Sequence, residues 1–518
     1  MTTGRGLSGH PLAALPLLVL AGVRPVSAEQ RGLSLVEAVR LTVARQPEIK
    51  LSERQVEASE GERQVASGDF DPRLQLALLR SRERMPLLPA TGLPGETDTE
   101  TNESGYQVGV AKLFRSGLVV SPRVEMSRTR SALDSPLENR GRVSLAAAQP
   151  LLRGFGAQAV AAGETAATID LRAASVDLRH TIASSVLRTT TAYWAYVAAA
   201  RRREIVAEAE GRFRAMGKDA QILLDARAIA AADIKQLRAN LAQRTSARLE
   251  AEQAQVQARH ELGMAMGLPN AEITSLPPPS DPMPAVREDA SLPQAADLLA
   301  SALERRADLR AARLRADSAG VRRGAAKNGV RPRLDVVVEA GYAGLDEGGG
   351  FGRYFTPFDR RVPGLNASAS LVLDWPTANR AARGRLASSQ AVADQADITA
   401  AELARRISSD VTVAASDLTL GRERVIAAGE AASLYRSAVD DEKQKLRLGL
   451  GTVIDVVVTE DHLNDSLLDE LSARLAYANA LVRLRFETGT LVSVDGAEQQ
   501  LDLETLTTVP PLPSGSHR

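Results

Sequence analysis

The chain of 518 residues contains no cysteine, which excludes several kinds of site. Without cysteine there is no disulfide, no thiolate-bound metal and no lipid attached through an N-terminal cysteine. The histidines also have no spacing typical of a metal site; they are His10, His180, His260, His462 and His517. We therefore expect neither a bound metal nor a cofactor.

The chain is also poor in aromatic residues and carries no net charge. Aromatic residues make up 3% of the chain, which is low for a compact core of this size, and 64 basic residues balance 64 acidic ones. The zero balance gives no reason to expect a nucleic-acid partner. The prominent residues are Ala, Leu, Arg, Glu and Gln, as in long helices and coiled coils.

Long hydrophobic runs are missing after the N-terminus. Residues 1–28 are typical of a secretory signal peptide, with Arg5 as the positive charge, an apolar core and cleavage after Ala28. A membrane anchor is the alternative, but the apolar run is shorter than the ~20 residues that a spanning helix needs. If the exported chain enters a membrane, it must do so as a β-barrel, because only helices and closed barrels satisfy their backbone groups in lipid.

Three blocks of sequence occur twice in the same order and indicate a tandem duplication. The matched pairs are Arg45 to Leu74 with Arg305 to Leu334, Ser144 to Pro150 with Ser370 to Pro376, and the segment around Asp233 with the segment around Asp455. The predicted organisation is a signal peptide at 1–28, a first repeat at 29–280, a second repeat at 281–493 and a disordered tail at 494–518.

Each repeat is predicted to contain a helix, strands, a long helix and a further helix. Apolar residues spaced three and four apart in proline-free stretches predict the helices. These span residues 33–68, 157–225 and 231–266 in the first repeat, and 295–328, 378–446 and 452–488 in the second. The two shorter helices of a repeat together nearly match its long helix in length, so they are expected to run end to end alongside it.

Strand-like alternation follows the first helix of each repeat. The clearest case has Leu365, Leu371 and Trp375 on one side and Ser368 and Ser370 on the other. Alternating segments with flanking aromatics are typical of a transmembrane β-barrel, although a soluble β-sandwich alternates in the same way. Four to six strands cannot close a barrel, which takes at least about eight. The barrel is therefore expected to be shared in a cyclic oligomer.

The number of strands in the first repeat stays open at this point. That repeat has four strand-like segments, and the second has two. The extra pair, about Tyr106 to Met126, either enlarges the barrel or forms a hairpin that does not span the membrane.

Three motifs resemble the TolC-type outer-membrane efflux family. They are Leu33 to Val39 with Pro47 eight residues later, the strand-to-helix exit Gln149 to Gly154, and the helix-hairpin tip Leu446 to Val456. The resemblance extends over about Leu33 to Val492. It implies a mainly α-helical fold with a β portion, in which the long hairpins of three copies form a helical barrel capped by a shared transmembrane β-barrel.

The resemblance also implies a location and a set of partners. It implies a homotrimer in contact with outer-membrane lipid and extending into the periplasm. A periplasmic adaptor and an inner-membrane pump, of the resistance-nodulation-division or ABC type, would dock below it. The expected function is that of a passive exit duct in a tripartite efflux or type I secretion system.

The second hairpin tip carries the candidate partner contacts. Gly449 and Gly451 permit the positive φ that a tight turn between helices needs, and the resemblance implies that the adaptor engages this turn. The candidate contacts are Leu448, Gly449, Leu450, Gly451 and Thr452. The matching first tip, Leu224 to Ala230, has no glycine, so the adaptor either distinguishes the two tips or binds only the second.

Two acidic residues are gate candidates. Asp455 resembles an acidic gate position of the family, and Asp233 is its counterpart in the first repeat. On a three-fold axis Asp455 would form a ring of three carboxylates that attracts cations. The resemblance implies a second gate acid one helical turn later in some members of the family; this chain has Val458 there, which leaves open whether the gate is a single ring. The alternative is that Asp455 is only a first-turn acid favoured by the helix dipole.

The sequence shows no catalytic constellation, so we do not expect an enzyme. It has no phosphate-binding glycine loop and no nucleophile elbow. The main alternative to a duct is a secreted or periplasmic structural coiled-coil protein without a membrane barrel. A periplasmic enzyme is a third possibility, but it needs an active-site cluster that the sequence does not contain. No residue expected in the duct indicates a cargo.

Overall fold

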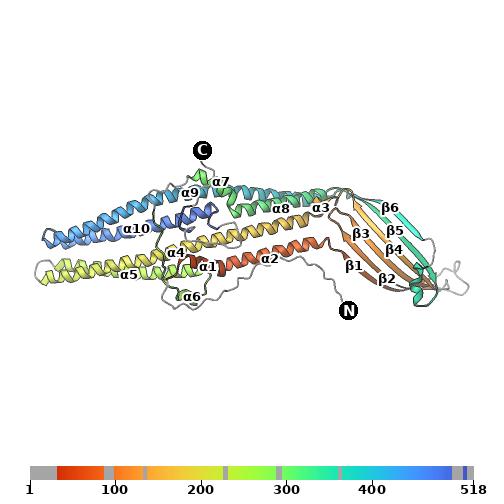
Figure 1. The fold of residues 1–518 in the computed structure, drawn as a ribbon, viewed down its shortest axis with the longest axis horizontal. Helices are drawn as coiled ribbons and strands as arrows, with labels where there is room; N and C mark the ends of the chain where they lie inside the picture. The colour runs from red at the N-terminus through yellow and green to blue at the C-terminus, as the bar shows by residue number, and fades with distance from the viewer. Residues whose placement is uncertain are drawn as a thin grey trace, which may run out of the picture.

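The computed structural model describes residues 32–86, 98–131, 137–225, 231–286, 294–359, 364–492 and 506–509, so the expected signal peptide lies outside the described residues. The molecule is elongated, with a β-sheet at one end and long helices over the rest (Figure 1). The helices are α1 (Leu35–Arg45), α2 (Pro47–Gly68), α3 (Ala157–Val160), α4 (Ala162–Asp225), α5 (Ala231–Ala265), α6 (Asn270–Thr274), α7 (Ala295–Arg305), α8 (Ala307–Gly329), α9 (Arg380–Arg447) and α10 (Val453–Glu487). The strands are β1 (Arg73–Pro86), β2 (Asp98–Leu113), β3 (Val119–Ser131), β4 (Glu138–Pro150), β5 (Arg333–Glu347) and β6 (Leu365–Asp374).

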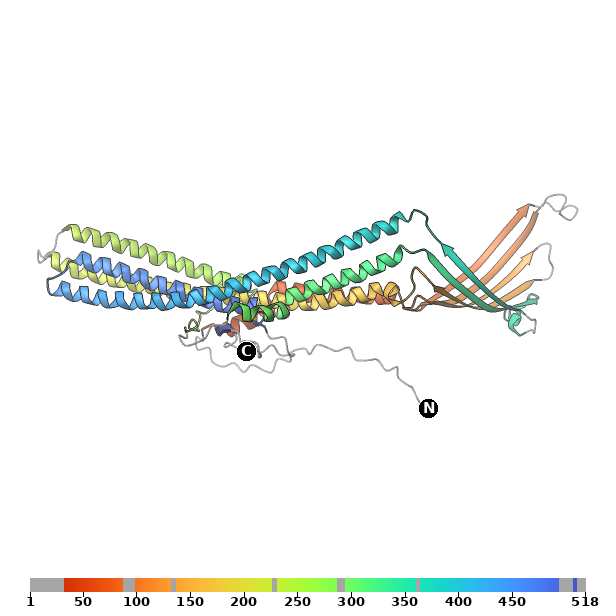
Figure 2. The same ribbon diagram turned by 90° about the horizontal axis from the view of Figure 1, so that it is seen from above.

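Four helices form one layer next to the sheet. α2 packs along α4, α4 along α8, and α8 along α9, so α2 and α9 are the edges of this layer. Farther from the sheet, α4 packs against α5 and α10, and α9 packs against α10 (Figure 2). The 64 residues of α4 correspond to about 96 Å at 1.5 Å per residue. As expected, α2 and α5 run along the single helix α4, and α8 and α10 run along α9.

Both predicted first helices are broken, which differs from the sequence expectation. Residues 33–68 form α1 and α2 with Gln46 extended between them, and residues 295–328 form α7 and α8 with Arg306 extended between them. Pro47 explains the first break, because the residue before a proline is pushed out of the helical region. The second break has no proline, and buried ion pairs described below hold Arg306 instead.

A glycine packs against each of these breaks. Gly267 and Gly489 both have left-handed backbones, with φ of 72° and 69°. A Cβ on Gly267 would lie 2.8 Å from the carbonyl oxygen of Arg45, and a Cβ on Gly489 would lie 3.0 Å from the carbonyl carbon of Arg305. Both positions therefore need glycine for conformation and for close approach.

The six strands form one antiparallel sheet in chain order. The β2–β3 hairpin is inserted between β1 and β4 and pairs with both, so it is part of the sheet. Its turn is anchored to the helices, because Arg115 Nε and Nη2 donate to the Glu164 carboxylate at 2.7 and 2.6 Å. β1 and β6 are the edges, and every residue of both strands is exposed.

The largest core lies in the middle of the elongated molecule, where α1, α4, α5, α6 and α10 meet. This region is called the waist below. Tyr193 and Trp194 of α4 are fully buried there, together with Leu35 of α1 and Leu262 of α5. The Tyr193 hydroxyl donates to the carbonyl oxygen of Leu33 at 2.9 Å, which satisfies its polar group inside the core. Among the described helices, none combines the length and the apolarity that a membrane-crossing helix needs.

The expectation of a disordered tail at 494–518 is wrong for residues 506–509. Leu506 is fully buried in the waist core. Arg485 Nη2 donates to the Thr508 hydroxyl at 2.7 Å and to the carbonyl oxygen of Val509 at 3.1 Å. Burial of one leucine and these hydrogen bonds hold the segment on α10, and the rest of the predicted tail lies outside the described residues.

Candidate functional site

The turn between α9 and α10 forms the second hairpin tip. Gly449 has φ of 73°, as the sequence predicts, whereas Gly451 does not have a positive φ. A Cβ at Gly451 would lie 3.4 Å from Lys445 Cβ, an ordinary van der Waals contact, so neither backbone conformation nor space requires glycine there. Leu448 and Leu450 are 66% and 76% exposed. The end of the helical part therefore presents two large apolar side chains to its surroundings.

Asp455 takes part in a capping box at the start of α10. Its Oδ2 accepts hydrogen bonds from the Thr452 backbone N–H at 2.9 Å and from the Thr452 hydroxyl at 2.7 Å, and its own N–H donates to Thr452 Oγ1 at 3.2 Å. The Thr452 side-chain hydrogen bond lowers the pKa of Asp455. Asp455 thus has a structural role as a capping acid, whether or not it also faces a pore.

The end of α4 and the start of α5 lie, with the tip between α9 and α10, at the end of the molecule away from the sheet (Figures 1 and 2). Residues 226–230 of the first tip lie outside the described residues. Asp233 is the third residue of α5. Its neighbour Ile234 belongs to the same buried apolar cluster as Val453 and Val457 of α10. The structure therefore places the first turns of α5 and α10 close together.

Ion pairs join the two hairpins between one and four turns from the tips. Glu460 of α10 is completely buried; its carboxylate accepts from Arg212 Nε of α4 at 2.8 Å and from Lys443 Nζ of α9 at 2.7 Å. Arg244 of α5 pairs with Asp461 of α10. This cluster leaves no signal in the sequence, because it depends on the packing of α4 and α5 against a helix more than two hundred residues away.

A second buried cluster lies at the break between α7 and α8. Arg306 Nη2 donates to Asp308 at 2.7 Å, Nη1 donates to Glu487, and the guanidinium lies 4.7 Å from the centre of the Phe486 ring. Burial raises the pKa of Glu487. Burial lowers the pKa of His180, whose Nδ1 lies 4.0 Å from Asp308. These contacts fasten the end of α10 to the break and to α4.

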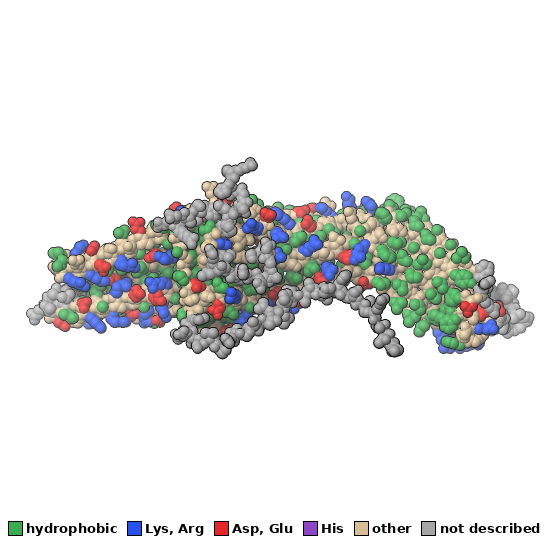
Figure 3. Space-filling model, viewed as in Figure 1, with side chains coloured by type: hydrophobic (Ala, Val, Ile, Leu, Met, Phe, Trp, Pro, Cys, Tyr) green, Lys and Arg blue, Asp and Glu red, His purple; other side chains and the backbone are tan. Residues whose placement is uncertain are grey.

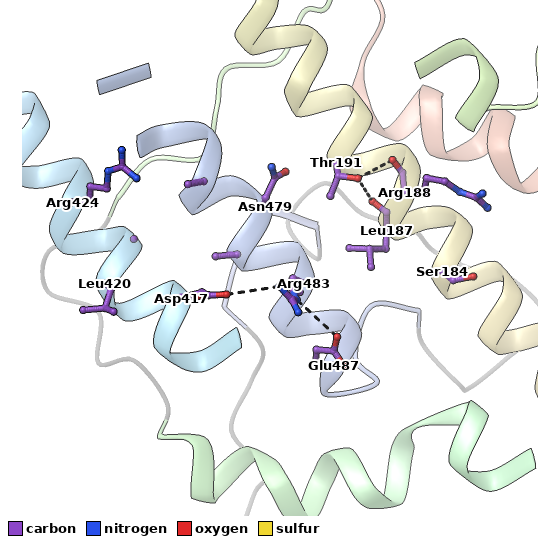
Figure 4. A pocket seen from close by; sticks show the side chains of 13 residues that line it. Ser184, Leu187, Arg188, Thr191, Asp417, Leu420, Arg424, Asn479, Arg483 and Glu487 are labelled. Carbon is purple, nitrogen blue, oxygen red and sulfur yellow. Dashed lines mark hydrogen bonds and ion pairs between the residues drawn. The ribbon is translucent and has the colours of Figure 1, made fainter. Parts of the chain in front are cut away.

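A groove of 630 Å³ is lined by residues of α4, α9 and α10 (Figure 4). Three of its charged side chains lie close together: Arg483 lies 3.8 Å from Asp417 and 4.0 Å from Glu487. The Thr191 hydroxyl donates to the carbonyl oxygen of Leu187 in its own helix at 3.0 Å. The groove is therefore best described as part of the helical wall. Within the described ranges, no group of three acidic or histidine side chains is placed to hold a metal.

The register of the sheet separates an apolar face from a polar face. Directly paired residues share a face, and successive residues alternate between faces. One row across all six strands is Leu76, Val108, Val124, Val143, Tyr342 and Leu365. The next row, on the opposite face, is Gln75, Gly109, Arg123, Ser144, Gly341 and Asn366. Hydrophobic side chains cover the visible face of the sheet in Figure 3.

Aromatic side chains mark the far end of the apolar face. The segment after β5 contains two short 3-10 helices, η1 (Gly352–Tyr354) and η2 (Thr356–Phe358). Tyr354 stacks on Tyr106 with ring centres 5.8 Å apart, and Arg128 lies 4.6 Å from the Tyr354 ring centre. Aromatic and charged side chains together at the rim of an apolar band are typical of a membrane–water interface.

Several solved structures with this fold are outer-membrane channels. The chain is similar to the outer-membrane channel OprN (17% identity, TM-score 0.65, covering 88% of this chain and 90% of that one) and to CmeC of Campylobacter jejuni (13%, 0.63, 88% and 85%). It is also similar to the open state of MtrE of Neisseria gonorrhoeae (14%, 0.59, 88% and 88%). No curated protein sequence matches significantly. Residues 298–490 match the family model for outer membrane efflux proteins. The family match thus lies in the second repeat, and the fold is shared with these outer-membrane channels.

Proposed function

We propose that three copies of the chain form a passive exit duct through the outer membrane and the periplasm. The observation that carries this proposal is that both edges of the molecule are open, at β1 and α2 on one side and at β6 and α9 on the other. Exposed edge strands pair with further chains unless they are protected. In a closed ring of copies every edge strand is paired with a neighbouring copy, so no exposed edge remains. Three copies of a six-stranded sheet give about eighteen strands, enough to enclose an aqueous channel.

In this proposal each copy contributes its two repeats, residues 29–280 and 281–493, as neighbouring sectors of the wall. The apolar face of the sheet contacts outer-membrane lipid, and the polar face lines the channel. The ring performs no chemistry, so the energy for export comes from an inner-membrane pump of the resistance-nodulation-division or ABC type. The match to the efflux family model supports tripartite efflux, and export of polypeptides in a type I secretion system is the second candidate.

The hairpin tips are the proposed contact with a periplasmic adaptor. Leu448 and Leu450 support this role, because large apolar side chains this exposed at the tip are suited to burial against a partner. Gly449 and Thr452 fix the shape of the turn that presents them, and Gly451 lies in the same turn. We also propose that Asp455 contributes to a ring of carboxylates at the tunnel entrance, with Asp233 as its counterpart in the first repeat.

The native mass of the protein, solubilised in detergent from the outer-membrane fraction, tests the duct. A trimer of the mature chain is the expected result and supports the shared barrel. A soluble monomer or dimer that is absent from this fraction overturns the proposal and leaves the structural coiled-coil alternative.

The two faces of β6 give a sharper test. Leu371 belongs to the apolar face and is 65% exposed, so Leu371→Arg places a charge in lipid at a cost of about 2–4 kcal/mol near mid-bilayer. We expect this variant to be lost from the outer-membrane fraction, as measured by fractionation and immunoblotting. Ser370→Arg is the matched control, because its side chain is on the polar face of the same strand. Equal assembly of both variants would argue against a membrane barrel.

A further inference from the structure

The far end of the apolar sheet face carries a group of arginines. Successive residues of a strand alternate between faces, so Leu74, Leu76 and Leu78 of β1 share the apolar face with the arginines at the next three alternate positions. β3 changes from apolar residues to arginines in the same way after Met126. We call these five arginines the basic cluster; they are Arg80, Arg82, Arg84, Arg128 and Arg130.

The register of the strands places these arginines near one another. Asn102 of β2 lies directly between Arg82 of β1 and Arg130 of β3, and both arginines are exposed. Neighbouring strands are ~4.8 Å apart, so the backbones of these two arginines are about 10 Å apart. Arg80 lies two residues from Arg82 on the same face of β1. Arginine side chains are long enough to converge across such distances, and each guanidinium binds phosphate through two parallel N–H groups.

The basic cluster contains more guanidinium groups than its neighbouring carboxylates can pair. Arg82 Nη2 and Arg84 Nη2 share Glu100 Oε2, at 2.7 and 3.0 Å. Among the described residues, no ion pair involves Arg80 or Arg130. These two arginines are therefore the most available to a ligand.

The other described acids at this end of the face do not cancel the positive charge. Asp98 is exposed at the start of β2. Asp346 of β5 is 3% exposed and accepts a hydrogen bond from the Thr356 hydroxyl. Arg353 and Asp359 of the segment after β5 add one charge of each sign. In the described part of this face, the five arginines of the cluster therefore meet three carboxylates, of which one is buried.

Arg128 connects the basic cluster to the aromatic rim of the apolar face. Its Nε donates to Asn139 Oδ1 at 2.6 Å, and its Nη2 donates to the carbonyl oxygen of Gly350 at 2.9 Å. The guanidinium lies over the ring of Tyr354, whose hydroxyl donates to the carbonyl oxygen of Ser104. In Figure 3, charged side chains gather at the far end of the hydrophobic sheet face. The basic cluster therefore directly adjoins the apolar surface.

The polar face of the same strand ends is acidic. Glu103, Glu138 and Glu347 lie in one row there, and Glu83 lies on the same face. Arg140 also lies on this face, and its Nη2 is 3.3 Å from Glu138 Oε1. The positive charge is therefore a property of the apolar face, so a ligand of the basic cluster lies on the outside of the proposed barrel.

We propose that the basic cluster binds the phosphate groups of an outer-membrane lipid, whose acyl chains lie along the apolar part of the same face. This inference rests on the proposed barrel and identifies a ligand of its outer surface. A free phosphate ion matches the charge of the cluster but gains nothing from the adjoining apolar surface. A phosphorylated lipid matches both, because its phosphate groups and its acyl chains are joined in one molecule.

Removing the two arginines without an ion pair tests the site. The variant is Arg80→Gln with Arg130→Gln, and binding is measured by native mass spectrometry of the detergent-solubilised trimer titrated with lipid A, a phosphorylated glycolipid. We expect the apparent affinity to fall about tenfold. Arg123→Gln with Arg142→Gln is the matched control, because it removes two exposed arginines from the polar face; it is expected to bind like the unchanged protein. An unchanged affinity in the first variant, or an equal loss in both, overturns the site.

The source of the phosphate is tested on the unchanged protein, so that a defect of assembly in a variant does not affect the result. Lipid A is expected to bind about tenfold more tightly than lipid A whose phosphate groups have been removed. Inorganic phosphate at millimolar concentration is not expected to displace it. Equal affinity for the two lipids would assign binding to the apolar surface alone, and displacement by inorganic phosphate would assign it to a free anion. Either result overturns the lipid site but leaves the duct, whereas a native monomer overturns both.

Discussion

The carboxylate of Asp455 accepts two hydrogen bonds from Thr452, and this residue is also the proposed gate. Substitution separates the two roles. Thr452→Ala removes the N-cap at a cost of about 1 kcal/mol but keeps the negative charge, whereas Asp455→Asn removes the charge. We expect only Asp455→Asn to reduce cation selectivity in single-channel recordings. Equal selectivity in both variants would show that Asp455 acts through the cap alone.

His180 gives a pH dependence at the waist. Burial lowers its pKa below the usual value of 6.5, so the folded state binds fewer protons than the unfolded chain as the pH falls through this value. Stability from the neutral imidazole is therefore present above about pH 6.5 and is lost on acidification. We expect the apparent melting temperature, followed by circular dichroism, to fall between pH 7 and pH 5. His180→Asn should show a shallower slope, and equal slopes would contradict the assignment.

A glycine packs against each helix break, and the second of them can be tested. Gly489 combines a positive φ with close approach to Arg305, so Gly489→Ala is expected to cost about 1–3 kcal/mol. Gly320→Ala in α8 is the control; its added Cβ meets nothing within 4 Å, and the change should stabilise the helix by up to about 1 kcal/mol. Thermal unfolding of the two variants checks this. Similar melting temperatures would mean that the second break tolerates a side chain.

The helices and strands could largely be predicted from sequence because their signals are local. Apolar spacing of three and four located α4 and α9, and alternation located the strands. The break at Arg306 was missed because no proline marks it; it depends on burial against Glu487, 181 residues away. The Glu460 cluster was missed for the same reason. The role of Asp455 in the cap could be predicted only in part. The sequence indicated an acid in the first turn of the helix, but its hydrogen bonds to Thr452 are known only from the structure.

At the scale of the whole molecule, the β2–β3 hairpin determines the width of the proposed barrel. Deleting residues 98–131 leaves β1 and β4 antiparallel and able to pair, with four strands per copy. Because barrel diameter grows roughly in proportion to strand number, we expect the barrel to narrow by about one third. Electron microscopy of the purified trimer measures this. An unchanged diameter would show that the hairpin does not contribute to the barrel wall.

The same hairpin differs from the other strands in how it connects to the helices. Four strands join a helical segment directly through the main chain: β1, β4, β5 and β6. β2 and β3 have no such link. The turn between them contacts the helices through the Arg115–Glu164 ion pair. Strands can therefore be gained or lost at this point without altering any covalent link to the tunnel. Evolution can thus adjust the circumference of the proposed barrel while the helical part of the molecule stays the same.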